Sequence, residues 1–303
     1  MNPQQIGCSP GYTFAHYRLE ATLERYLWSI DRVEKLGYKN FGLEILEPEH
    51  VALYRQPGAI SRILERSYRT GVNLAHFTLW HCCTSLTSSD LDRRKLGVRQ
   101  FSEGVEIAKQ LSIPLVAIGS AWPPEWVRSY SPEYEHAPAA EYFTPSTTEY
   151  EHLWTAYSEA MRQCLEIAEK ESITLGLEPR ANSLVSTADS FLRLWEKLGS
   201  EQLRCVLDMM HCAFQRENVP VAIKKLGPRL AVLQVCGTDG RTLNHLPLDP
   251  EDVGLKRAIA SLAEIGFTGT VDIELYGMPV EIVDDCYRNA REILERHIMG
   301  STC

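Results

Sequence analysis

The chain has 303 residues, of which 44% are hydrophobic, and it carries a formal net charge of −9 at pH 7. This length is sufficient for one large hydrophobic core, so we expect a single domain over 1–303. The acidic balance disfavours a nucleic-acid partner, which requires clustered Lys and Arg, and a compact neutral or hydroxylated small molecule is a more suitable ligand.

The first half of the chain alternates short apolar runs with longer amphipathic stretches. The apolar runs predict strands, and the amphipathic stretches predict helices, two of which stop at Gly37 and Gly71 in left-handed caps. The predicted strands are 5–8, 40–46, 72–77 and 113–118, and the predicted helices are 22–36, 58–70 and 91–111. A strand followed each time by a helix favours a parallel sheet.

The segment 119–146 interrupts this alternation. It is rich in proline, tyrosine and tryptophan and has no sustained period. Because a loop this long inside a compact domain is usually functional, we expect it to form a lid or a wall over a site.

The alternation resumes after the long loop. The predicted strands are 174–178, 204–208, 230–235 and 269–274, and the predicted helices are 147–171, 187–198, 220–226, 252–265 and 279–297. Eight strand–helix units predict an α/β fold, a (β/α)8 TIM barrel in a single domain with a long loop after strand four. An open doubly wound sheet is the alternative, but GCSPGYTF near the first strand lacks the GxGxxG spacing of that fold.

Membrane and secretory features are absent from the sequence. The start MNPQQIG has neither the basic nor the apolar part of a signal peptide, and no run approaches the roughly 18 apolar residues that span a bilayer. The nine cysteines contain no CxxC pair. We therefore expect a cytoplasmic protein with reduced thiols and no membrane partner.

Four oxygen-bearing side chains end four successive predicted strands: Glu178, Asp208, Gln234 and Glu274. In a barrel these strand ends meet at one face, where three carboxylates repel one another unless a cation or protons neutralise them. Four oxygen donors predict one divalent metal ion, Mn²⁺ or Mg²⁺ rather than Zn²⁺. For any one glutamate alone, a surface salt bridge is the simpler explanation.

Further candidates follow the same strands. His211, expected in the loop DMMHCAF, and Arg241 should reach over the metal site and hold substrate oxygens, although a helix-start residue and a surface cation are the alternatives. His76 and His245 are weaker candidates, because a histidine in an apolar setting is more often a hydrogen-bonded core residue. Trp122 in the long loop can stack on a substrate ring or hold the loop down by packing.

The motifs LGLEPR, VLDMMH, LQVCGTDGR with the following HLPL, and VDIELYG resemble one known superfamily. It is the xylose isomerase-like barrel superfamily, and within it the group of sugar phosphate isomerases and epimerases. That group includes ketose 3-epimerases, hydroxypyruvate isomerase, inosose dehydratase and dehydroshikimate dehydratase. The resemblance covers nearly the whole chain and is specific from about 173 to 276.

The resemblance implies roles for individual residues. The implied metal ligands are Glu178, Asp208, Gln234 and Glu274. The two glutamates also form the acid/base pair in the family's ketose epimerases, and the matching His211 and Arg241 hold substrate oxygens. Gln234 stands where many members have a histidine, and the second glutamate that several epimerases carry after strand five is absent from ANSLVS.

These features together predict proton transfer beside a carbonyl in a sugar or related polyhydroxy compound. Glu178 or Glu274 would remove the proton, and an enediolate would lead to an epimer or an isomer. The alternative is a lyase that eliminates water from a keto-sugar, keto-cyclitol or dehydroshikimate-like substrate, with Arg180 binding a carboxylate. An abasic-site nuclease would need more histidines and a basic groove, and a non-catalytic barrel would not need the ligand set. Barrels of this kind often pair through helices and loops, so we also consider a homo-oligomer.

Overall fold

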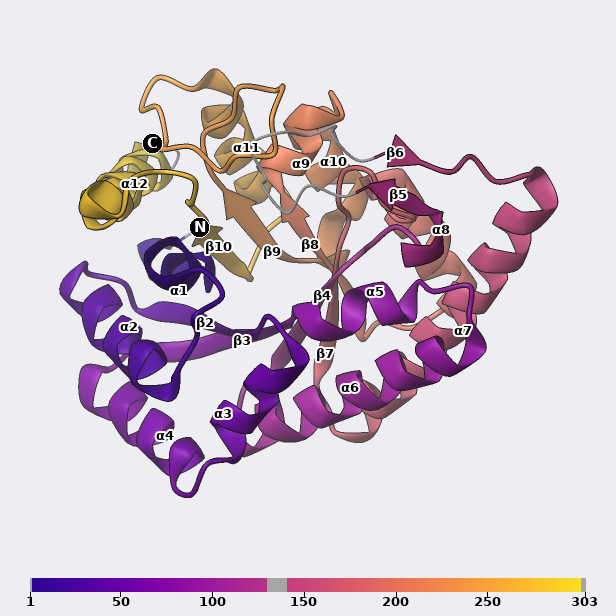
Figure 1. Ribbon diagram of the computed structural model, residues 1–303. Coiled ribbons are helices and arrows are strands. Elements are labelled where there is room, and N and C mark those ends of the chain that lie inside the picture. Colours follow the sequence, from indigo (N-terminus) through magenta and orange to yellow (C-terminus); the bar gives the residue numbers. More distant parts are fainter. Residues whose placement is uncertain (1, 130–140, 301–303) are drawn as a thin grey trace.

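The computed structural model describes residues 2–129 and 141–300 and contains a closed barrel of eight parallel strands surrounded by helices (Figure 1). In spatial order the strands are β1 (Ile6–Cys8), β10 (Thr270–Ile273), β9 (Leu230–Val235), β8 (Leu203–Asp208), β7 (Thr174–Glu178), β4 (Leu115–Gly119), β3 (Asn73–Leu79) and β2 (Asn40–Ile45). The predicted (β/α)8 TIM barrel is confirmed.

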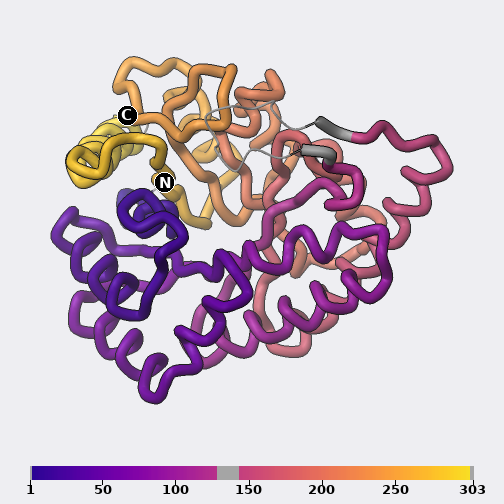
Figure 2. Tube along the Cα trace, in the orientation of Figure 1, coloured from indigo at the N-terminus to yellow at the C-terminus, as the bar shows by residue number. Residues whose placement is uncertain are grey.

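Helices connect successive strands and cover the outside of the barrel. The longer ones are α2 (Leu23–Lys35), α4 (Ala59–Thr70), α6 (Leu91–Gln110), α7 (Thr147–Lys170), α8 (Ala188–Leu198), α10 (Val219–Leu226), α11 (Val253–Glu264) and α12 (Val283–Gly300). The trace in Figure 2 runs once around the barrel and returns the last unit to the first, where β1 pairs with β10. The first and last parts of the chain therefore close the barrel together.

Several short elements lie between strands and the helices that follow them. They are α1 (Gly11–Tyr17), α3 (Val51–Arg55), α5 (Cys83–Leu86) and α9 (Met209–Phe214), with short 3₁₀ turns that include η2 (Pro48–His50), η3 (Trp80–Cys82) and η4 (Pro124–Trp126). His211 thus lies in a helix, and the expected loop at DMMHCAF is wrong. Helices of four to seven residues are too short to show a 3.6-residue period in the sequence.

The long segment after β4 is partly structured. The 3₁₀ turn η4 leads into a hairpin of β5 (Val127–Ser129) and β6 (Glu141–Tyr142), in which Val127 pairs with Tyr142. The predicted irregular loop 119–146 is therefore wrong at these strands, whereas 130–140 lie outside the described residues. Strands of two and three residues are too short to show an alternating pattern.

The interior of the barrel is apolar directly below the strand ends. Ala117, Val206 and Val232 pack together there, and all three are buried. Alternate residues of a strand face the same side, so Asp208 and Gln234, two residues after the valines, also face the barrel axis. The apolar layer closes the barrel and places polar groups above it. No helix in the described part of the chain has the length and apolar character needed to cross a membrane.

Candidate functional site

The carboxyl ends of β7 to β10 bring four polar side chains to one face of the barrel. Glu178 and Asp208 are the last residues of β7 and β8, and Gln234 lies in β9 directly opposite Asp208. Glu274 follows β10, and its backbone N–H donates to the carbonyl of Val235 at 3.1 Å. All four polar side chains are buried. The strand register thus accounts for their common location.

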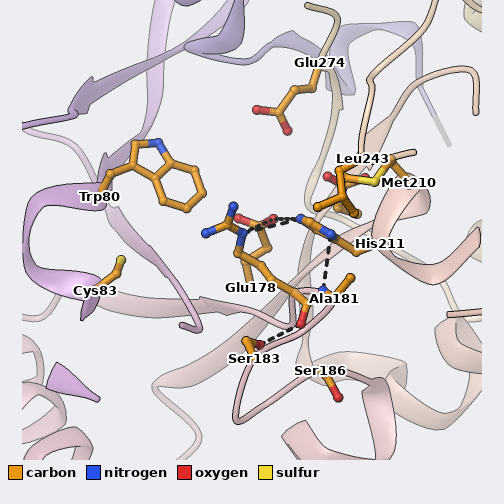
Figure 3. Close-up of polar contacts among 12 residues, drawn as sticks. Trp80, Cys83, Glu178, Ala181, Ser183, Ser186, Met210, His211, Leu243 and Glu274 are labelled. Carbon is orange, nitrogen blue, oxygen red and sulfur yellow. Dashed lines mark hydrogen bonds and ion pairs between the residues drawn. The ribbon is translucent and has the colours of Figure 1, made fainter. Parts of the chain in front are cut away.

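His211 lies beside Glu178 and near Asp208. Its Nε2 lies 3.2 Å from Glu178 Oε1, and its Nδ1 accepts a hydrogen bond from the Ala181 amide at 3.3 Å (Figure 3). Glu178, Asp208 and His211 each offer one potential ligand atom, and these atoms lie within 4.8 Å of one another. Arg180 is close to the same group, with Nε 3.9 Å from Glu178 Oε1.

Asp208 also contacts His245, which the loop after β9 carries back over the barrel. His245 Nε2 lies 2.7 Å from Asp208 Oδ2 and 4.0 Å from Glu274 Oε2. The Met210 amide donates to Asp208 Oδ1 at 2.7 Å. Burial raises the pKa of Asp208, but His245, His211 and the Met210 amide outweigh it and bring the pKa to about 2. Asp208 is therefore a carboxylate at neutral pH.

Glu274 is in the opposite electrostatic situation. Burial, followed by the charges of Asp208 and Glu178, raises the pKa of Glu274 well above its usual value. Figure 3 shows the Glu274 carboxyl directed toward the space above Glu178 and His211. The neighbouring Gln234 Oε1 is buried and has no hydrogen-bond partner among the described residues. Converging carboxylates and an unpaired amide oxygen fit a hard divalent cation, which accepts such oxygen donors.

A pocket of about 340 Å³ opens beside these groups. Its lining includes Phe14, Glu44, Trp80, Arg180, Glu274 and Tyr276. The Arg180 guanidinium lies 4.9 Å from the centre of the Trp80 ring, and the rings of Phe14 and Tyr276 meet edge to face at 5.5 Å. The volume is in the range of small-molecule sites, which are about 300–1,000 Å³.

Two of the predicted substrate-binding histidines are buried beneath or beside the site. His76 Nε2 lies 2.5 Å from Asp272 Oδ2 inside the barrel, and His76 does not line the pocket. Gly42 leaves room for this ring, since a Cβ there would be 2.4 Å from His76 Cε1. His245 stacks on Tyr276, with ring centres 4.2 Å apart. His76 thus has a structural partner, whereas His245 contacts the site.

Two further residues that were predicted to bind the substrate, Arg241 and Trp122, do not line this pocket. Arg241 is exposed in the loop after β9, where its backbone N–H donates to Asp239 Oδ1 at 2.8 Å. Trp122 is half-buried, packs edge to face on Trp126 and lines a different pocket with Phe143. Their assignment to the substrate stays a prediction.

One residue of the pocket, Glu44, was not identified from the sequence. Glu44, the penultimate residue of β2, has only 2% of its surface exposed. Its Oε2 accepts a hydrogen bond from Trp80 Nε1 at 3.1 Å, and its Oε1 has no partner in the part of the chain that the structure describes. Burial raises the pKa of Glu44 to about 8. Strand NFGLEI also ends near a carboxylate, so the rule applied to the other four strands would have found it.

The fold and the buried carboxylates define a TIM barrel with a polar site at the carboxyl ends of its strands. The sequence matches the family model described as xylose isomerase-like TIM barrel over residues 30–297. The chain therefore belongs to the xylose isomerase-like TIM barrel family. A search of curated proteins finds no significant match.

Solved structures share this fold at low sequence identity. A D-psicose 3-epimerase from Clostridium cellulolyticum H10, determined with D-tagatose, is 18% identical, with 98% of this chain and 96% of that chain covered and a TM-score of 0.69. A D-tagatose 3-epimerase-like protein is 19% identical, with 98% of each chain covered and a TM-score of 0.76. A xylose isomerase-like TIM barrel protein from Mycobacterium smegmatis in complex with magnesium is 14% identical, with 97% of each chain covered and a TM-score of 0.69.

Proposed function

We propose that the protein is a divalent-metal-dependent isomerase or epimerase of a sugar or related polyhydroxy carbonyl compound. The observation that carries this proposal is the convergence of buried Glu178, Asp208 and Glu274 from three strand ends, beside a pocket of small-molecule size that Glu274 lines. Sugar epimerases among the structural neighbours support it. A small carbohydrate-like substrate follows from the proposal, whereas a cytoplasmic location and a homo-oligomer stay predictions.

The proposed ligands of one Mn²⁺ or Mg²⁺ ion are Glu178, Asp208, Gln234 and Glu274. When bound, such an ion acts as a Lewis acid that makes the C–H beside a carbonyl more acidic. The unpaired Gln234 Oε1 supplies a neutral donor, which suits the oxygen preference of both ions. His211 and His245 are close enough to Glu178 and Asp208 to orient the carboxylates.

Glu178 and Glu274 are the proposed acid/base pair. Burial and neighbouring charges raise the pKa of Glu274, which suits this carboxyl group to hold a proton, and Glu178 is the proposed partner of opposite role. One removes the proton next to the carbonyl and leaves an enediolate, and the other returns a proton to the opposite face. His211 and Arg180 then donate hydrogen bonds to the oxygens on which negative charge develops.

β-Elimination is the second candidate, because Arg180 beside Glu178 offers a guanidinium to a substrate carboxylate. The two reactions begin with the same proton abstraction. They differ in their product, since loss of a β-hydroxyl gives a conjugated enone that absorbs in the ultraviolet. Absorbance with no epimer formed would assign the lyase.

The test uses the purified protein with added Mn²⁺ or Mg²⁺ and a panel of free and phosphorylated ketoses in D₂O. We expect NMR to detect exchange of the proton beside the carbonyl and a new stereoisomer, and EDTA to abolish both. Glu274→Gln should lower turnover by about 10²–10⁴-fold while the protein stays folded. Glu196→Gln, an exposed carboxylate on α8, is the matched control. Metal-independent turnover, or full activity of Glu274→Gln, would contradict the proposal.

A further inference from the structure

The pocket beside the carboxylates has a second end, formed by residues of β2, the turn after it and η3. Glu44, Glu47 and Trp80 line this end, whereas Glu274 and Tyr276 line the side next to β10. In Figure 3, Trp80 and His211 lie on opposite sides of Glu178. Of the proposed metal ligands only Glu274 belongs to the pocket lining, so a ligand that reaches from Glu274 across the pocket contacts Glu44 and Trp80 at the other end.

Glu44 is held rigidly at this second end. Its backbone carbonyl accepts hydrogen bonds from Tyr26 at 3.0 Å and from Tyr54 at 2.8 Å. Its carboxyl group is fixed by the indole N–H of Trp80 through Oε2. The structure thus fixes the strand end and one carboxyl oxygen and leaves Oε1 without a partner among the described residues.

A buried oxygen of this kind needs a hydrogen-bond partner, since an unpaired polar group is unfavourable. Glu44 belongs to the pocket lining, so a bound ligand can supply that partner. A hydroxyl group suits Oε1 because it both donates and accepts a hydrogen bond. The raised pKa of Glu44, about 8, is consistent with a neutral carboxyl group that does the same.

The groups at this end suit an uncharged ligand group better than an anionic one. Glu44 and Glu47 are both acidic residues, and the arginine of the lining, Arg180, lies over the Trp80 ring with its Nε 3.9 Å from Glu178 Oε1. A phosphate placed against Glu44 would meet a carboxyl group instead of the Arg, Lys or backbone N–H groups that bind phosphates. An uncharged, hydroxylated chain end is compatible with the same surroundings.

We propose that Glu44 anchors the uncharged, hydroxyl-bearing end of the substrate, with Trp80 as the residue that positions its carboxyl group. The protein then selects a free polyhydroxy carbonyl compound over its terminal phosphate ester. This inference rests on the proposed function, because it assigns one end of the same pocket to the same substrate.

The experiment measures KM and kcat of the Mn²⁺-loaded protein for D-fructose, D-tagatose and D-psicose and for D-fructose 6-phosphate. For the best free ketose, we expect Glu44→Leu to raise KM at least tenfold and to change kcat less than threefold. Glu44→Gln, which keeps a donor and an acceptor, should stay within threefold of the wild type in KM. Trp80→Phe, which removes the N–H that holds Oε2, should raise KM about threefold. Glu49→Gln, an exposed carboxylate on η2 outside this pocket, is the control.

The possible failures are separable. Two results overturn this inference alone. The first is turnover of a free ketose by Glu44→Leu with an unchanged KM, and the second is a KM for the phosphate ester equal to that for the free ketose. If Glu44→Leu does not fold, an unchanged KM in Trp80→Phe overturns it instead. Absence of turnover and of metal binding in the wild-type protein overturns the proposed function and this inference together. Mn²⁺ affinity should be unchanged in Glu44→Leu and lost in Glu274→Gln, which separates the two ends of the pocket.

Discussion

The Glu44 carboxyl should make the metal-free protein less stable as the pH rises. Burial raises its pKa from the ordinary 4.5 to about 8 in the folded state. A carboxyl group whose pKa is raised on folding contributes its full stability below pH 4.5 and loses it progressively as the pH rises from there to the folded pKa. Glu44→Gln keeps the size and hydrogen-bonding capacity of the side chain but does not titrate. We therefore expect the unfolding free energy of Glu44→Gln to increase relative to that of the wild type as the pH rises.

The expected magnitude follows from the two pKa values of Glu44. Between pH 5 and pH 7 the carboxyl group is ionised in the unfolded chain and neutral in the folded one, and each pH unit costs about 1.4 kcal/mol. The difference in unfolding free energy between Glu44→Gln and wild type should thus grow by roughly 2–3 kcal/mol over this range. The other titrating groups are common to both proteins. Position 44 carries no charge in the folded state of the wild type or of Glu44→Gln, so the contributions of these other groups cancel in the difference.

The assay for Glu44 is urea unfolding followed by tryptophan fluorescence at pH 5, 6 and 7, with EDTA present. Both proteins are measured at each pH, and the difference in unfolding free energy is plotted against pH. A steady rise in favour of Glu44→Gln supports a neutral buried carboxyl group. Parallel curves, with a change of less than about 0.5 kcal/mol, would refute it, because an ordinary pKa gives no difference above pH 5.

Three further predictions concern the proposed metal site. Asp208→Asn should weaken Mn²⁺ binding by more than about 100-fold in calorimetry, because it removes a charged oxygen donor, and circular dichroism checks the fold. His211→Gln should lower kcat by about 100-fold in the ketose assay, and an unchanged kcat would remove His211 from the reaction. Mn²⁺ should raise Tm more at pH 7.5 than at pH 5. Because the pKa of Glu274 is raised, a higher pH destabilises the metal-free protein and also leaves Glu274 ionised and able to bind the ion. Equal increases in Tm at the two pH values would contradict this.

The barrel could be predicted from the sequence because its signal is local and repeated. Each strand is a short apolar run, and each long helix has an amphipathic period, so eight repeats leave few alternative folds. The strand-end rule placed Glu178 and Asp208 on one face, and the structure brings them together with His211. This rule depends only on the direction of the strands and on the position of each residue along its strand.

The loop after β9 could not be predicted in the same way. It returns His245 to Asp208, 37 residues earlier in the chain, by pairing Gly237 with Leu246 and His245 with Tyr276. These isolated bridges depend on the spacing between β9 and β10, which no local pattern specifies. His76 shows the same limit, since its partner Asp272 is 196 residues away. Sequence spacing identifies which histidines lie near strands, but not what each one contacts.

Two buried oxygens without a hydrogen-bond partner among the described residues, Gln234 Oε1 and Glu44 Oε1, have different chemical surroundings. Gln234 Oε1 lies close to the carboxylates at the ends of β8 and β10, where the proposed cation would be a partner that also reduces their repulsion. Glu44 Oε1 belongs to a buried carboxyl group whose other oxygen, Oε2, accepts from the Trp80 N–H; burial favours its neutral form, and a cation would first have to displace its proton. A single ligand that satisfies both must therefore present oxygens to a metal at one end and an uncharged hydroxyl group at the other. A free polyhydroxy carbonyl compound has this arrangement, and a terminal phosphate ester does not.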